Sequence, residues 1–279
     1  MNLTDAQLRG RIKNIAKENN ADARVLMRLY MMERFLERVS VSKYRDNFVI
    51  KGGMLITSML GVSLRSTMDI DTTIQNYDLS IENTRKMIES ICLERVFDGI
   101  TFDIKSVTEI MDEMEYPGFR FGLEASARRM VTPIKIDVST GTAITPSAVE
   151  HEYKLMLEDR TISLLSYNIE TVLSEKLQTI LARGVLNTRM RDFYDVHVLL
   201  TSRNNDIHRN VLKQAFLATC KSRQGESVVA NTMKIYNNIA NDARLTSLWK
   251  NYQQKYPYAE DLSFDAVMDS LKLLLEMVA

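Results

Sequence analysis

The sequence predicts a mixed α/β fold in its first part and a helical fold in its second part. Between about residues 48 and 141, short runs of β-branched residues alternate with helical patterns and glycine turns. From about Thr161 onward glycine becomes scarce, and long helical patterns continue to the C-terminal segment LKLLLEMVA. We therefore expect an α/β core with N-terminal helices over residues 1–160 and a helical domain over residues 161–279.

The composition narrows the class of protein. Hydrophobic residues make up 45% of the 279 residues and charged residues 26%, which is typical of a soluble globular chain. Lys plus Arg and Asp plus Glu number 36 each, so no net charge attracts nucleic acid to the whole molecule. The two cysteines lie far apart, the N-terminal segment is polar, and no apolar run reaches the ~20 residues that span a bilayer. We expect a cytoplasmic protein without disulfides or a membrane segment.

The first forty residues predict two helices. Thr4 and Gln7 form a capping-box pattern before the first helix. The second helix is expected from Asp22 to Val39, because apolar residues recur at helical spacing along this segment.

The elements of the α/β core follow in alternation. The apolar run over residues 48–50 predicts a strand, and residues 54–60 predict a helix after the pair Gly52-Gly53. The segment RSTMDIDTTI predicts a strand over residues 68–74, and a helix is expected over residues 80–95 with Ser80 as its N-cap. Three further segments have strand patterns: ITFDIKSVTEI, FRFGLEASA and TPIKIDVSTG.

Asp69 and Asp71 are the first candidate site residues. Side chains two apart in a strand face the same way, so both carboxylates project from one face together with Thr73. Two adjacent carboxylates repel each other unless a cation joins them, and hard oxygen donors at this spacing suit Mg²⁺. The alternative is an edge strand with a solvated acidic face, and the pair alone leaves this alternative open.

Two other features favour a metal and phosphate site. In IKIDVST, Asp137 faces away from the apolar residues of its strand, so a strand beside the first would bring a third carboxylate to the pair. Gly52 and Gly53 stand between a strand and a helix, where backbone N–H groups can approach a phosphate closely. Taken separately, Asp137 also fits a solvated strand residue, and the glycine pair also fits a tight turn.

A lysine in the helical part adds an independent indication. In IETVLSEKLQTILAR, Lys176 lies within the apolar stripe, which is costly unless the ammonium group finds a buried carboxylate or a bound phosphate. A lysine that reaches solvent from the edge of the helix is the alternative. In the next helical segment, RMRDFYDVHVLL, Asp192 and Asp195 lie away from the expected core face and are expected to be structural.

These segments, in this order, resemble the AbiEii/AbiGii-type nucleotidyltransferase toxins, a branch of the DNA polymerase β-like nucleotidyltransferase superfamily. The matching segments cover roughly residues 30–200: RFLERVSVSKYRDNFVIKGGMLI, RSTMDIDTTI, IKIDVSTG, and SEKLQTILAR with MRDFYDVHVLL. The resemblance implies a polymerase β-like nucleotidyltransferase core with a mixed sheet, N-terminal helices and a C-terminal helical domain.

The resemblance also implies roles for individual residues. Asp69, Asp71 and Asp137 would hold Mg²⁺. Lys176 would bind the triphosphate, and Asp192 would be the acidic residue of the last motif, with Asp195 as the alternative. The residues expected to bind the nucleotide are Lys51, Gly52, Gly53, Arg65, Thr67 and Lys176.

The implied activity is Mg²⁺-dependent transfer of NMP from an NTP co-substrate to an acceptor hydroxyl, by a toxin that is paired with an antitoxin. Several relatives modify the 3′ end of tRNA, which makes tRNA or another RNA the candidate acceptor. A protein or small-molecule acceptor and a catalytically silent binding module are the alternatives. An RNA acceptor needs basic residues near the site, and the candidates are Arg128-Arg129 and the group Arg183, Arg189 and Arg191.

Overall fold

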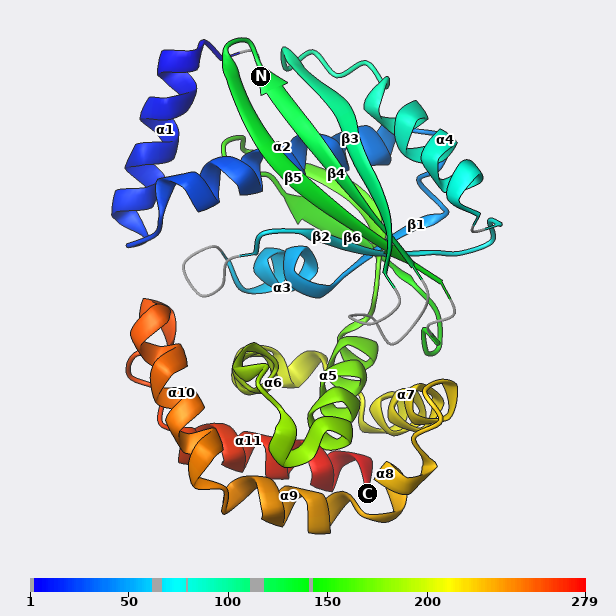
Figure 1. Cartoon of the computed structure of the whole chain (residues 1–279), viewed down its shortest axis with the longest axis vertical. Helices are drawn as coiled ribbons and strands as arrows, with labels where there is room; N and C mark the ends of the chain where they lie inside the picture. The colour runs from blue at the N-terminus through cyan, green and yellow to red at the C-terminus, as the bar shows by residue number, and fades with distance from the viewer. Residues whose placement is uncertain (1–2, 62–66, 79, 111–117, 141–142) are drawn as a thin grey trace. The chain divides into compact units, whose positions relative to one another are not determined.

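The structure is a computed structural model that describes residues 3–61, 67–78, 80–110, 118–140 and 143–279 (Figure 1). The chain forms two compact units. The first unit comprises Met1–Gly141 and Ala148–Ser166, and the second comprises Thr142–Ser147 and Tyr167–Ala279.

The first unit is built on a seven-stranded mixed sheet with the strand order β3-β4-β5-β2-β1-β7-β6. Strand β1 runs antiparallel to β2 and parallel to β7, and β2 runs parallel to β5. The pairs β3–β4, β4–β5 and β6–β7 are antiparallel. The strands are β1 (Phe48–Lys51), β2 (Ile70–Ile74), β3 (Ile100–Ile110), β4 (Gly118–Ala127), β5 (Met130–Ser139), β6 (Val149–Lys154) and β7 (Thr161–Ser166). The predicted mixed α/β class is confirmed.

Side-chain caps fix where the helices of the first unit begin. Thr4 and Gln7 form the predicted capping box at the start of the first helix. Asp22 accepts hydrogen bonds from the first turn of the second helix, and Ser80 is the N-cap of the fourth, as its position predicted. The helices are α1 (Asp5–Glu18), α2 (Ala23–Val41), α3 (Gly52–Leu60) and α4 (Ile81–Cys92).

The centre of the sheet has an apolar face and a polar face. Helix α2 packs on the apolar face, where the ring of Phe35 lies 6.2 Å from the ring of Phe48 on β1. Phe48 pairs in register with Ile74 of β2, so both side chains face α2. Lys51 and Asp71 are also paired in register, an odd number of positions further along each strand, and therefore face the opposite side.

Strands β6 and β7 were not predicted. The prediction of helical structure from Thr161 is wrong for residues 161–166, which form β7 beside β1. The first helix of the second unit begins only at Ile169. This strand is six residues long and directly precedes a strong helical pattern, so a window of helical length is dominated by the helix. Strand β2 begins at Ile70 rather than at residue 68, which leaves Asp69 at its entrance.

The second unit is helical throughout its described residues. Helix α5 packs against α6 and α7, and α11 packs against the same two helices. Leu173, Leu177 and Ile180 of α5 are fully buried in this core. The helices are α5 (Ile169–Arg183), α6 (Met190–Arg203), α7 (Arg209–Ser222), α8 (Glu226–Ala230), α9 (Thr232–Ala240), α10 (Ala243–Lys255) and α11 (Phe264–Val278).

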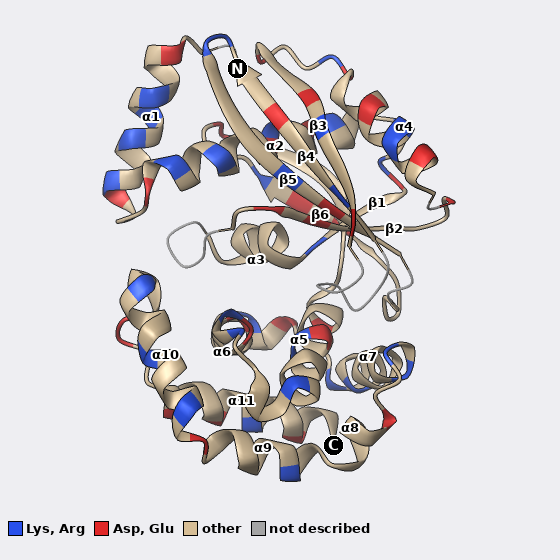
Figure 2. Cartoon of the chain, in the orientation of Figure 1, with Lys and Arg blue, Asp and Glu red and all other residues tan. Residues whose placement is uncertain are grey.

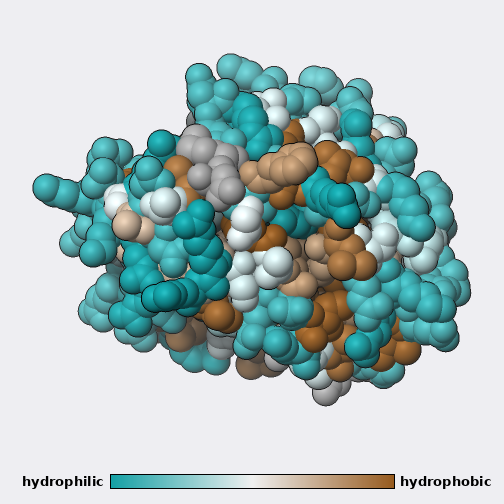
Figure 3. Space-filling model, turned by 90° about the horizontal axis from the view of Figure 1, so that it is seen from above, coloured by the Kyte–Doolittle hydropathy of each residue, from teal (hydrophilic) through white to brown (hydrophobic). Residues whose placement is uncertain are grey.

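The surface carries mixed charge and mixed hydropathy. Basic and acidic residues both occur along α1 and α4, in keeping with their equal totals in the sequence (Figure 2). Apolar side chains stand among polar ones on the face in Figure 3. In the first unit the most exposed of the large apolar side chains described are Leu93 and Phe97, at 81% and 92%. Among the described helices, none combines the length and the hydrophobicity needed to cross a bilayer.

Candidate metal centre

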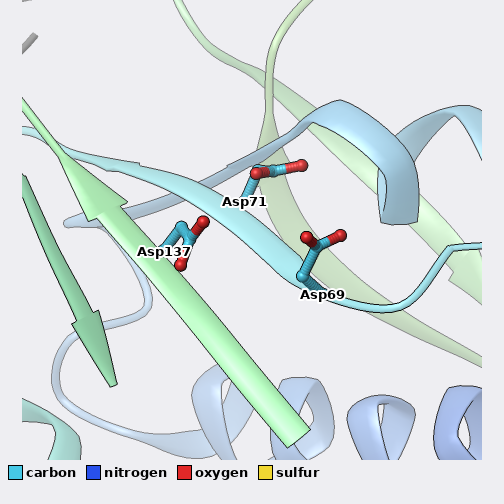
Figure 4. A group of neighbouring side chains, drawn as sticks. All are labelled: Asp69, Asp71 and Asp137. Atoms are coloured by element: carbon cyan, nitrogen blue, oxygen red, sulfur yellow. The ribbon is translucent and has the colours of Figure 1, made fainter. Parts of the chain in front are cut away.

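Three aspartates from two neighbouring strands of the first unit converge on one point (Figure 4). Asp69 and Asp71 come from the start of β2, and the parallel register of β5 places Asp137 directly beside Asp71. One carboxylate oxygen from each of the three lies within 4.8 Å of the other two. Asp137 is buried, while Asp69 and Asp71 keep part of their surface exposed. The fold therefore assembles three hard oxygen donors at a position that remains open to solvent.

The carboxyl group of Asp71 shows that the negative charge in this group is incompletely balanced. Burial, followed by the charges of Asp69 and Asp137, raises the pKa of Asp71 to about 6. Lys51 and the backbone N–H of Gly53, which donates to Oδ2 of Asp71 over 3.3 Å, act in the opposite direction. Because the net shift is still upward, a further positive charge at this point would be stabilising.

Gly52 is required by both its backbone conformation and its neighbour. Its φ of +58° lies in the left-handed region, which side-chain-bearing residues rarely adopt. A Cβ atom at this position would lie 2.0 Å from Oδ2 of Asp71, so any side chain would displace the carboxylate. The glycine pair thus brings the first turn of α3 against the acidic group, where the N–H of Gly53 meets Asp71.

Two cations flank the acidic group on the neighbouring strands. Lys51 lies opposite Asp71, and its Nζ donates to Oγ of Ser139 over 2.9 Å. Arg120 of β4 lies opposite Asp137 and donates two hydrogen bonds of 2.8 Å, from Nε to Oδ1 and from Nη2 to Oδ2. The sequence predicted a role for Lys51 but none for Arg120.

Thr67 lies beside the acidic group, and Arg65 is outside the described residues. The Oγ1 atom of Thr67 donates to Oδ1 of Asp69 over 3.2 Å and to its backbone oxygen over 3.3 Å. Thr67 is fully buried, so this hydroxyl orients Asp69 from inside the protein. The structure thus brings together the predicted residues of the first unit that it describes, and their roles toward a nucleotide stay predictions.

The predicted residues of the second unit form an ion cluster of their own. Nζ of Lys176 on α5 lies 2.8 Å from Oδ1 of Asp192 and 2.6 Å from Oδ2 of Asp195, both on α6. Arg189 holds the second oxygen of Asp192 at 3.1 Å. The anion that Lys176 was expected to find is therefore a pair of carboxylates within its own unit. The expectation that both aspartates lie away from the core is wrong, because α6 is packed on several sides and the two residues are buried.

The arginines proposed as RNA contacts are dispersed. Arg128 and Arg129 form the turn between β4 and β5, eight residues from Asp137, which is about 26 Å at the rise of an extended strand. They do not line the acidic group. In the second unit Arg189 is engaged with Asp192, and Arg191 donates to the hydroxyl of Tyr256 over 3.2 Å.

The donor set of the acidic group fits a divalent cation. Mg²⁺ is bound by one or two carboxylates together with substrate phosphates, and its usual ligands are oxygen atoms. Asp69, Asp71 and Asp137 supply such oxygens close together, and burial together with the charges of the other two raises the pKa of Asp71. A triphosphate carried by the cation would meet the first turn of α3, where the backbone N–H groups favour anions.

Comparisons with known proteins give the chain a family. The family described as "Nucleotidyl transferase AbiEii toxin, Type IV TA system" matches residues 34–270. No curated protein matches the chain. Among solved structures, JHP933 from Helicobacter pylori is 13% identical and aligns with a TM-score of 0.50, over 91% of this chain and 93% of that one.

Two further solved structures are similar. A candidate nucleotidyltransferase from H. pylori is 15% identical, with a TM-score of 0.49 over 91% of this chain and 96% of that one. An antigenic nucleotidyltransferase-like protein from Paracoccidioides brasiliensis is 12% identical, with a TM-score of 0.37 over 84% of this chain and 95% of that one. At such identities the likeness to solved structures concerns the fold.

Proposed function

Because the chain belongs to the AbiEii nucleotidyl transferase toxin family of type IV toxin–antitoxin systems, we propose that it is a Mg²⁺-dependent nucleotidyltransferase. It transfers NMP from an NTP to an acceptor hydroxyl and releases pyrophosphate. The family implies an antitoxin partner for this toxin. We propose the 3′ end of tRNA as the acceptor, on the strength of the family resemblance alone.

The observation that carries this proposal is the convergence of three carboxylates on a glycine-opened helix. Asp69, Asp71 and Asp137 offer oxygens within 4.8 Å of one another, and Gly53 places a backbone N–H against Asp71. The cation ligands thus lie beside the first turn of α3, whose other N–H groups we propose to bind the phosphates, and a metal–triphosphate complex needs both.

The residues of the chain divide the work as follows. Asp69, Asp71 and Asp137 would hold the cation, which when bound would neutralise charge on the triphosphate and acidify the acceptor hydroxyl. The N–H groups at the start of α3 orient the phosphates, and Lys51 adds positive charge beside Asp71. Thr67 keeps Asp69 oriented through its 3.2 Å hydrogen bond.

The transfer itself exchanges a phosphoanhydride bond of the NTP for a phosphoester bond to the acceptor. The acceptor oxygen forms a bond to the α-phosphorus while the bond between that phosphorus and the bridging oxygen to the β-phosphate breaks. Pyrophosphate leaves with the electron pair of the broken bond. The hydroxyl proton goes to a carboxylate of the acidic group, for which we propose Asp137. The proposed roles of Lys176 in binding the triphosphate, and of Asp192 or Asp195 in the last motif, rest on the family resemblance.

Replacement of the cation ligands tests the proposal. We expect the double substitution Asp69→Asn with Asp71→Asn to lower nucleotidyl transfer by about 10³-fold or more, because the amides retain shape but lose the charge that holds the cation. Transfer is measured with labelled NTPs and tRNA. Asp103→Asn on the exposed face of β3 is the matched control and should leave the rate unchanged. Full activity of the double variant would show that the assignment is wrong.

The same assay separates the other candidate functions. Labelled NTPs are incubated with RNA, with protein partners and with neither. Transfer of the label to protein, and not to RNA, would identify a protein as the acceptor. Calorimetry with each NTP and Mg²⁺ identifies a catalytically silent module, which would bind none of them.

A further inference from the structure

A row of four charges crosses the centre of the sheet of the first unit. Register pairs join Arg120 of β4 to Asp137 of β5, Asp137 to Asp71 of β2, and Asp71 to Lys51 of β1. Residues that pair directly across adjacent strands project from the same face. The row therefore reads positive, negative, negative, positive on the face that carries the candidate metal centre.

The two cations of this row are used differently. Lys51 is buried, its Nζ donates to the hydroxyl of Ser139, and its charge lowers the pKa of Asp71. Arg120 instead grips Asp137 directly, with one N–H on each carboxylate oxygen at 2.8 Å. Such a fork holds a carboxylate in one plane more firmly than a single ammonium group does.

The grip of Arg120 falls on a carboxylate that the candidate metal centre needs. Asp137 is a member of the group whose oxygens lie within 4.8 Å of one another. A cation bound there would share Asp137 with the guanidinium group and would be repelled by its charge. The side chain of Arg120 is 30% exposed, so it can withdraw toward solvent, whereas that of Asp137 is 6% exposed and fixed in the sheet.

We propose that Arg120 is a positioning residue that holds Asp137 in the cation-free protein and competes with a divalent cation for its carboxylate. Arg120 thereby sets the cation affinity of the site below the value that three carboxylates alone would give. This inference rests on the proposed function, because it takes the three aspartates to be cation ligands.

Binding of Mn²⁺ without nucleotide tests the inference, with free Mn²⁺ measured by electron paramagnetic resonance. We expect Arg120→Gln to bind Mn²⁺ about tenfold more tightly than the wild type, because a charge in contact with a ligand is removed. Arg120→Lys, which keeps the charge and loses the fork, should lie between them. Lys105→Gln is the control, since Lys105 forms an exposed ion pair with Glu124 on the β3–β4 hairpin.

A double-variant cycle separates competition for Asp137 from a structural role. In the Asp137→Asn background, Arg120→Gln should no longer change Mn²⁺ affinity, because its target carboxylate is absent. Unchanged or weaker Mn²⁺ binding by Arg120→Gln, or an equal gain in the Asp137→Asn background, would overturn the inference and leave the proposed function standing. Absence of Mn²⁺ binding in the wild type without nucleotide would overturn the inference, whereas the proposed function is decided separately by the transfer assay with labelled NTPs. If Arg120→Gln does not fold, the comparison of Arg120→Lys with the wild type decides, with tighter binding expected.

Discussion

The two aspartate clusters of this protein differ in how their charges are balanced. In the first unit, Asp71 shares its surroundings with two other carboxylates, and its pKa is raised to about 6 by burial and by their charges. In the second unit, Asp192 and Asp195 both contact the ammonium group of Lys176, and Asp192 also holds Arg189.

We interpret this difference as one between a cluster that stabilises the fold and a cluster that we propose to bind a cation. A buried ion cluster with matched charges fastens α5 to α6, and removing one member leaves its partner buried without compensation. A cluster with excess negative charge costs stability in the free protein, and a bound cation recovers that cost. If the proposed function holds, unbalanced charge marks the cation site more clearly than the mere presence of acidic residues does.

The largest expected effect concerns the balanced cluster. Asp195→Ala should lower the free energy of unfolding by about 3 kcal/mol, because Asp195 is fully buried and its loss leaves Lys176 with less compensation. Urea denaturation measures the change. The control is Arg189→Ala, whose side chain is 50% exposed and whose loss should cost less than about 1 kcal/mol. A variant Asp195→Ala that is fully stable but inactive would assign Asp195 to catalysis and abolish the contrast between the clusters.

The unbalanced cluster should respond to substitution with the opposite sign. In the folded protein Asp71 keeps its proton up to about pH 6, whereas an Asp in the unfolded chain loses it near pH 3.8. The stability contributed by that proton is fully present below pH 3.8 and is lost as the pH rises to about 6. Asp71→Asn, which cannot ionise, should therefore be more stable than the wild type by roughly 2 kcal/mol at pH 7.5 without metal. Below pH 3.8 the difference should vanish.

Thermal unfolding in a chelator at the two pH values measures this difference. Asp103→Asn serves again as the exposed control and should behave as the wild type at both. A destabilised Asp71→Asn at pH 7.5 would mean that the ionised carboxylate is held by favourable contacts and that the cluster is balanced after all.

Local patterns were sufficient to predict most of the fold and the acidic group. Thr4 and Ser80 predicted helix starts because a cap is a contact over two or three residues. Asp69 and Asp71 could be placed on one side of a strand because alternation is a property of the strand itself. Strand β7 escaped prediction because it is six residues long and directly precedes the strong helical pattern of α5.

The contacts of Arg120 and Gly52 with the acidic group depend on strand register and on backbone conformation, and local sequence patterns do not predict these. Arg120 and Asp137 are paired because the two-residue turn Arg128-Arg129 joins β4 and β5. This turn pairs Ala127 with Met130, and the register continues without a shift to Arg120 and Asp137. Such a turn usually contains Gly or Asn, whereas here Arg128 adopts a φ of +53°, so no turn signal fixed the register. The close approach of Gly52 to Asp71 likewise requires a positive φ. Glycine adopts positive and negative φ about equally readily, so its presence alone does not predict this conformation.

The smallest expected effect is the pH dependence of cation binding, and it connects the raised pKa to the proposed site. Below about pH 6 a proton occupies Asp71 and competes with the cation for its oxygens. The affinity for Mn²⁺ should therefore be nearly constant between pH 7 and 8 and fall roughly tenfold from pH 7 to pH 5. Titration of Mn²⁺ at each pH measures it, and Asp71→Asn should bind weakly with a smaller dependence on pH over this range. Equal affinity at pH 5 and pH 7.5 in the wild type would mean that the cation does not bind the oxygens of Asp71. The proposal that the unbalanced cluster is the cation site would then be wrong.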